Sequence, residues 1–234
     1  MSTGSPASEE TPHDERPSSP LKLVLPALVA LVVIGGLTLL LVGGSSKPAL
    51  PNNASAAKTV AFDGETLSPA VPAPPLDTLR NYTGSSFNLA DDRGKAVFVT
   101  FLYTHCPDVC PLIASNLHNA YARMTPSMRS QVAIVVVSVD PRGDNARTVT
   151  AFMNEHELTG EGDYLIGSAP KLAHVWTQWN VGSEQDTGNP ELVNHSALIY
   201  GIGANGHMYT IYPANFQPGQ IIHDVPALLA RSTQ

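Results

Sequence analysis

The feature that most constrains the fold is a pair of uninterrupted apolar runs, residues 96–102 and 132–139, both rich in β-branched side chains. Unbroken runs of this kind are typical of strands that are buried on both faces of a sheet. Between them, residues 112–124 place apolar side chains at helical spacing on one face. Strand, helix and strand in this order predict a parallel pair joined by a right-handed crossover.

The remaining C-terminal segments alternate in the same way. They predict helices over residues 145–156, 169–179 and 217–231, and strands near 164–166, 196–200 and 208–212. The last two strands flank Asn205-Gly206, which favours a tight hairpin turn. Two parallel strands followed by a hairpin and a closing helix predict an α/β domain with a thioredoxin-like fold, in which helices flank a central mixed sheet.

The N-terminal third has a different character. Residues 1–22 are polar and rich in Ser, Pro and acidic side chains, which predicts a disordered tail. Residues 43–75 are rich in Ala, Pro and Ser and predict a tether. We therefore expect the folded domain to occupy residues 76–234, with the option of an additional N-terminal strand from about residue 60.

Residues 23–42 contain no charged side chain. A helix of this length rises about 1.5 Å per residue and spans the roughly 30 Å hydrocarbon core of a membrane. A cleaved signal peptide is the alternative, but its apolar region is shorter, about 7–15 residues, and a small-residue cleavage site follows closely. The nearest such triplet, Ala54-Ser55-Ala56, is well separated from the apolar run. We expect a single retained transmembrane helix.

Charge and cysteine content exclude several classes of protein. The formal net charge is -7, which disfavours a nucleic-acid binder. The chain has two cysteines, too few for a disulfide-stapled miniprotein or a four-thiolate zinc site. Two cysteines allow one disulfide or one pair of soft metal ligands.

Those two residues are Cys106 and Cys110, which directly follow the first apolar strand. Sites in open α/β sheets lie at the carboxyl ends of the strands. Pro111 suits the first helical position, which would make Cys110 the N-cap and leave Cys106 in the preceding loop. The positive end of the helix dipole would then favour thiolates. The spacing alone leaves both a structural disulfide and a metal-binding pair open. We expect Asp108, between them, to cap the helix rather than to bind metal.

Two thiolates with an imidazole would form a trigonal set suited to copper. His195 is one candidate, since it stands at the start of the predicted strand 196–200. His105 is next to Cys106 but would point to the opposite face of an extended segment. Three further histidines, His118, His156 and His174, fall in predicted helices. The residues alone therefore leave the third ligand open.

Three segments carry a resemblance to a known family. Residues 94–111, containing the cysteine block, are followed in the same order by Ser138-Val139-Asp140-Pro141 and Val193-Asn194-His195-Ser196. Together they resemble the Sco/SenC family of copper-binding, thioredoxin-like proteins, from about Phe62 to the C-terminus. The anchor and tether are similar to that family's plan as well.

The resemblance implies a membrane-anchored copper chaperone with the domain on the extracytoplasmic side. It implies copper ligands at Cys106, Cys110 and His195, and delivery to the binuclear copper A site of cytochrome c oxidase subunit II. A second protein that donates copper is compatible with this function. The alternative is a thiol:disulfide oxidoreductase in which Cys106 and Cys110 are the redox pair and reduce the acceptor's cysteines.

The chain departs from the family's pattern at two places. Asn194 replaces an acidic residue that often precedes the histidine, so it adds no negative charge beside the ligand. After Asp140-Pro141, Arg142 comes one position early and Gly143 fills its usual place, while Asp144 stays in register. We expect this segment to be structural, as a cap for the following helix.

Overall fold

The computed structural model describes residues 61–185 and 193–232. Seven strands form a mixed sheet in the order β1-β9-β8-β3-β4-β5-β2, and a separate ribbon pairs β6 with β7. The strands are β1 (Glu65–Pro72), β2 (Arg80–Asn81), β3 (Ala96–Leu102), β4 (Val132–Ser138), β5 (Asp163–Ile166), β6 (Ser183–Gln185), β7 (Val193–His195), β8 (Leu198–Ile202) and β9 (His207–Pro213). The helices are η1 (Leu89–Asp92), α2 (Val109–Arg123), α3 (Pro126–Arg129), α4 (Ala146–Glu155), α5 (Ala169–Gln178) and α6 (Pro218–Leu229).

Strand β3 is the middle strand of the sheet, and every one of its side chains is buried. It pairs parallel with β4 and antiparallel with β8, so Val99 lies between Val135 and Tyr200. The predicted parallel pair, the hairpin and the mixed sheet are confirmed. Gly206, with φ of +77°, takes the left-handed conformation in the β8–β9 turn that glycine adopts without strain.

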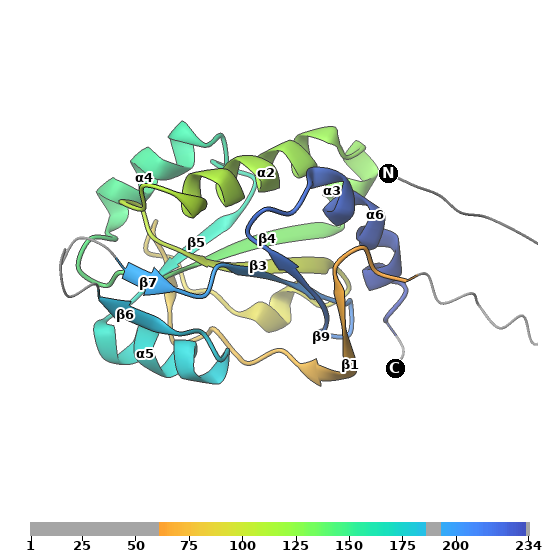
Figure 1. Cartoon of the computed structure of the whole chain (residues 1–234), viewed down its shortest axis with the longest axis horizontal. Coiled ribbons are helices and arrows are strands. Elements are labelled where there is room, and N and C mark those ends of the chain that lie inside the picture. The colour runs from red at the N-terminus through yellow and green to blue at the C-terminus, as the bar shows by residue number, and fades with distance from the viewer. Residues whose placement is uncertain (1–60, 186–192, 233–234) are drawn as a thin grey trace, which may run out of the picture. The chain divides into compact units, whose positions relative to one another are not determined.

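The helices lie on the two faces of the sheet (Figure 1). Helices α2 and α4 cover one face and α5 lies on the other. Because β3, β4 and β5 run parallel, their carboxyl ends lie at the same end of the sheet. Helices α2, α4 and α5 each begin after one of these strand ends. The loops that follow these three strands are therefore brought together.

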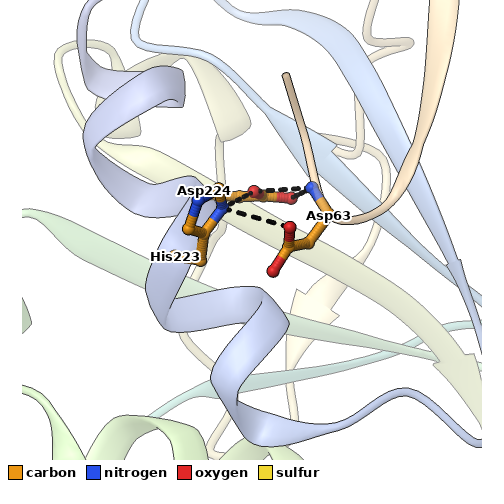
Figure 2. Close-up of side chains that lie close together, drawn as sticks. All are labelled: Asp63, His223 and Asp224. Carbon is orange, nitrogen blue, oxygen red and sulfur yellow. Dashed lines mark hydrogen bonds and ion pairs between the residues drawn. The ribbon is translucent and has the colours of Figure 1, made fainter. Parts of the chain in front are cut away.

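The domain begins earlier in the chain than the tether prediction allows. Residues of the predicted tether form β1, which pairs antiparallel with β9. The optional N-terminal strand from about residue 60 is therefore present. The buried carboxylate of Asp224 on α6 fixes the start of this segment (Figure 2). It accepts hydrogen bonds from the backbone N–H groups of Asp63 and Gly64 at 2.9–3.1 Å and from the Tyr212 hydroxyl at 2.7 Å. His223 Nδ1 lies 2.8 Å from the same carboxylate.

The predicted tail and transmembrane helix lie outside the described residues. Within residues 61–185 and 193–232, the helices are all too short or too polar to cross a bilayer.

Candidate metal centre

The two cysteines lie at the junction of β3 and α2, as the sequence predicts. Helix α2 begins at Val109 with Asp108 as its N-cap, so the prediction that Cys110 is the N-cap is wrong. The first backbone N–H groups of a helix have no intrahelical partner, so Pro111 is tolerated within the first turn and the helix starts earlier. The Asp108 side chain forms no capping hydrogen bond, which corrects that prediction too. The Cys110 backbone N–H instead points at Cys106 Sγ, at 3.4 Å.

His195 reaches the same place from the β6–β7 ribbon. The sequence predicted it at the start of a strand over residues 196–200, but it ends β7, and β8 begins only at Leu198. Its Nε2 atom lies 3.7 Å from Cys110 Sγ. Its Nδ1 atom lies 3.2 Å from the Ser196 carbonyl oxygen, a second polar contact that orients the ring.

The two sulfurs are free and differ in charge. Cys106 is 9% exposed and Cys110 is fully buried. The Cys110 thiol donates to Cys106 and, with further donation from His195 and backbone N–H groups, lowers the pKa of Cys106 from 9.0 to about 4 against the effect of burial. The pKa of Cys110 is raised well above its usual range, because it donates to Cys106 and is buried. In the reduced pair at neutral pH, Cys106 is therefore a thiolate and Cys110 a thiol.

Tyr103 is a site residue that the sequence analysis missed. It is 3% exposed, and its hydroxyl accepts the Val193 N–H at 3.3 Å while also hydrogen-bonding to Cys106. Its ring meets the His195 ring edge-on, with centroids 5.7 Å apart. Burial is the main reason that the pKa of Tyr103 rises to about 12. A tyrosine at the end of a buried strand has no sequence pattern that separates it from ordinary core, so no signal was available.

A second buried carboxylate holds the loop between β3 and the cysteines. Asp144 accepts hydrogen bonds from the Thr104 N–H at 2.9 Å, the Thr104 hydroxyl at 2.8 Å, Ser138 Oγ at 2.6 Å and the Tyr164 hydroxyl at 2.8 Å. Burial raises the pKa of Asp144. The segment is structural as expected, but the cap of α4 is supplied by Asn145, whose side chain accepts from two backbone N–H groups.

The other candidate histidines take no part in this cluster. His105 is exposed and faces Thr104 Oγ1 at 3.2 Å, near Asp140 and Asp144. His118 lies against the connection between α4 and β5, 2.9 Å from Glu161. The described part of the chain thus brings Cys106, Cys110 and His195 together and leaves the remaining predicted alternatives outside.

The domain has a mixed sheet flanked by helices, and its central strand leads into two cysteines that a histidine contacts. These features define a thioredoxin-like domain with a thiol-based centre. The family model described as SCO1/SenC matches residues 78–230, more than half of the chain. The chain belongs to the SCO1/SenC family.

Its curated relatives include the mitochondrial protein SCO2 homolog of Mus musculus, which is 27% identical over 153 residues. That match covers 63% of this chain and 59% of the relative, so the chain spans less than two thirds of the relative's length.

The solved structures that share the fold include the following three. The apo Sco1 protein of Thermus thermophilus has a TM-score of 0.61 at 25% identity and covers 72% of this chain and 97% of that chain. The copper-bound ScoI of Bradyrhizobium japonicum has a TM-score of 0.57 at 24% identity, with coverages of 68% and 99%. BsSco, which has a disulfide switch and is described as a member of the Sco family of cytochrome c oxidase assembly proteins, has a TM-score of 0.60 at 21% identity, with coverages of 71% and 99%.

Proposed function

We propose that this protein is a copper chaperone that binds one copper ion through Cys106, Cys110 and His195. The observation that carries the proposal is the convergence of the three donors: His195 Nε2 lies 3.7 Å from Cys110 Sγ, and Cys106 Sγ accepts the Cys110 backbone N–H. Two thiolates and one imidazole are the soft and borderline donors that copper prefers. The shared fold of the copper-bound Bradyrhizobium protein supports copper as the ion.

The charge state of the pair suits loading and release of Cu(I). Cys106 is ionised at neutral pH, whereas the Cys110 thiol must lose its proton to bind metal. Binding of Cu(I) should therefore release about one proton, and the apparent affinity should rise about tenfold per pH unit near neutrality. Three-coordinate copper leaves a position at which an acceptor thiolate can begin ligand exchange.

We infer that the acceptor is the copper A site of cytochrome c oxidase subunit II, because copper carried by thiolates exchanges readily onto a thiolate-rich site. The description of BsSco as a cytochrome c oxidase assembly protein supports an oxidase partner. The uncharged residues 23–42 support a membrane anchor. The extracytoplasmic side is proposed for the domain because the acceptor's copper site would lie there. Protease protection of the domain in sealed membrane vesicles of known orientation tests this placement, and cleavage from the cytoplasmic side would contradict it.

Cu(I) titration of the reduced full-length chain in detergent, against a competing chelator, tests the ligand set. We expect one tightly bound Cu(I), loss of binding in Cys106→Ser, and at least tenfold weaker binding in His195→Ala. His174→Ala, an exposed histidine on α5, is the matched control and should bind as the wild type does. The ligand set is wrong if the reduced chain holds no Cu(I), or if His195→Ala leaves Cu(II) binding and its absorption spectrum unchanged.

A second candidate function, reduction of an acceptor disulfide, is favoured by the unequal cysteines. The Cys106 thiolate would attack the disulfide and release one acceptor thiolate, forming a mixed disulfide. Cys110 would lose its proton and attack Cys106 Sγ, releasing the second acceptor thiolate and leaving a Cys106–Cys110 disulfide. Two electrons pass to the acceptor. Reduction of an oxidised copper-site peptide at an unchanged rate by His195→Ala would favour this function.

A further inference from the structure

A pocket of about 390 Å³ lies at the edge of the sheet, away from the three proposed copper ligands. It forms where β2 pairs with β5, so that Arg80 stands beside Ile166 and close to the start of α5. Its lining comes from the segment leading into β2, from the turn after it and from the first turns of α5: Asp77, Thr78, Leu79, Arg80, Ser86, Pro170, Lys171 and His174.

The fold brings these segments close together at Gly167, between β5 and α5. A Cβ atom at this position would lie 2.7 Å from Leu79 Cδ2, too close for a real contact. Glycine therefore allows the segment before β2 to pack against the beginning of α5. Leu79, only 2% exposed, and Pro170 supply the apolar part of the pocket lining.

Two of the lining side chains, Arg80 and Lys171, are cations in a chain whose net charge is -7. Lys171 and His174 lie three residues apart on α5 and so share one face of the helix. Within the described residues, neither side chain forms a hydrogen bond or an ion pair, and the Arg80 guanidinium makes one long bond, 3.4 Å, to the Gly84 carbonyl oxygen. Their donors are thus available to a ligand. Asp77 is the one acidic residue in the lining.

We propose that this pocket binds a phosphate group, carried by a small molecule or by a lipid headgroup. A guanidinium, an ammonium and an imidazole, with the hydroxyls of Thr78 and Ser86, can donate to more acceptor atoms than the two oxygens of a carboxylate. A phosphate offers three or four oxygens on one centre. The apolar lining accommodates the remainder of the ligand, since the pocket is larger than a phosphate ion alone.

Titration calorimetry of the copper-free full-length chain with pyrophosphate tests the proposal. We expect saturable binding that weakens at least tenfold in the double variant Arg80→Ala/Lys171→Ala. Arg123→Ala/Arg147→Ala removes two exposed arginines on α2 and α4, changes the net charge equally, and should bind as the wild type does. Asp77→Asn should bind more tightly, because it removes the only acidic group of the pocket.

Nanodiscs distinguish the two sources of phosphate. If phosphatidic acid added to phosphatidylcholine discs weakens pyrophosphate binding by competition, the ligand is the headgroup; if it has no effect, the ligand is soluble. The proposal is overturned if pyrophosphate does not saturate, if both double variants lose affinity equally, or if only an acidic peptide binds. Because the protein is free of copper, failure here leaves the copper proposal untouched, and Cu(I) binding should be equal in both double variants.

Discussion

The unequal charge of the two sulfurs can be tested by removing the donor that maintains it. The Cys110 thiol is the largest cause of the lowered pKa of Cys106. Cys110→Ala deletes this donor, whereas Cys110→Ser keeps an O–H group in its place, and both leave Cys106 as the only cysteine. A hydrogen bond to a charged group contributes about 1.5–3 kcal/mol, equivalent to about 1–2 pKa units. We expect the pKa of Cys106 to stay near 4 in the serine variant and to rise to about 5–6 in the alanine variant.

The assay is the rate of iodoacetamide alkylation between pH 3 and 9, because the thiolate is the nucleophile. Circular dichroism at each pH checks that both variants stay folded. If the alanine and serine variants titrate at the same pH, Cys110 does not donate to Cys106. If both titrate near pH 9, the thiolate itself is absent and the charge assignment is refuted.

The same shift predicts how stability depends on pH. The pKa of Cys106 in the folded chain, about 4, lies below its ordinary value of 9.0. The thiolate therefore stabilises the fold fully above pH 9, and this contribution is lost as the pH falls toward 4. Between these limits, the free energy of unfolding should rise by about 1.4 kcal/mol per pH unit, relative to Cys106→Ser. Urea unfolding of the copper-free wild type and of Cys106→Ser at pH 5.5 and 7.5 measures the difference. If the free energy of unfolding changes with pH equally in the two proteins, the prediction is contradicted.

Further substitutions test the supporting groups. Asp144→Asn puts an amide N–H₂ against two hydrogen-bond donors and should lower the free energy of unfolding by about 2–4 kcal/mol. Asn145→Ala, which removes the cap of α4, should lower it by about 1 kcal/mol. Urea unfolding measures both. Asp224→Asn should cost about 2–3 kcal/mol and speed hydrogen exchange of the amides that begin the domain. Tyr103→Phe removes a hydroxyl that hydrogen-bonds to Cys106, so it should raise the pKa of Cys106 in the alkylation assay by less than Cys110→Ala does; no shift would mean that the hydroxyl serves packing alone.

The centre of the sheet was predictable because β3 and β4 carry their own signal. Strands buried on both faces are continuously apolar, and residues 96–102 and 132–138 have both that pattern and the strand length. Strand β1 lacked that signal, since it is an edge strand with most side chains exposed and pairs only with β9. Its prolines, Pro69 and Pro72, are tolerated at an edge but gave the segment the composition of a tether.

The site was predictable only in part for a related reason. Cys106 and Cys110 are close in sequence, so their spacing and the preceding strand indicate a thiol pair. His195 lies 85 residues from Cys110 and needed the resemblance, because several histidines compete and only the folded ribbon selects one. Tyr103 connects both segments through hydrogen bonds that exist only in the folded state.

The two candidate functions begin at the same atom, so variants of Cys106 cannot separate them. Cys106 is the more exposed sulfur and is already ionised, so it meets either an incoming copper ion or a disulfide first. Cys110 follows in both reactions. His195 differs, because Cu(I) needs its Nε2 lone pair as a ligand, whereas disulfide exchange needs only the thiolate. Since His195 is a smaller cause of the lowered pKa than Cys110, His195→Ala should keep Cys106 ionised at pH 7. Loss of copper affinity with retained reductase rate in this one variant would therefore show that the imidazole serves the metal.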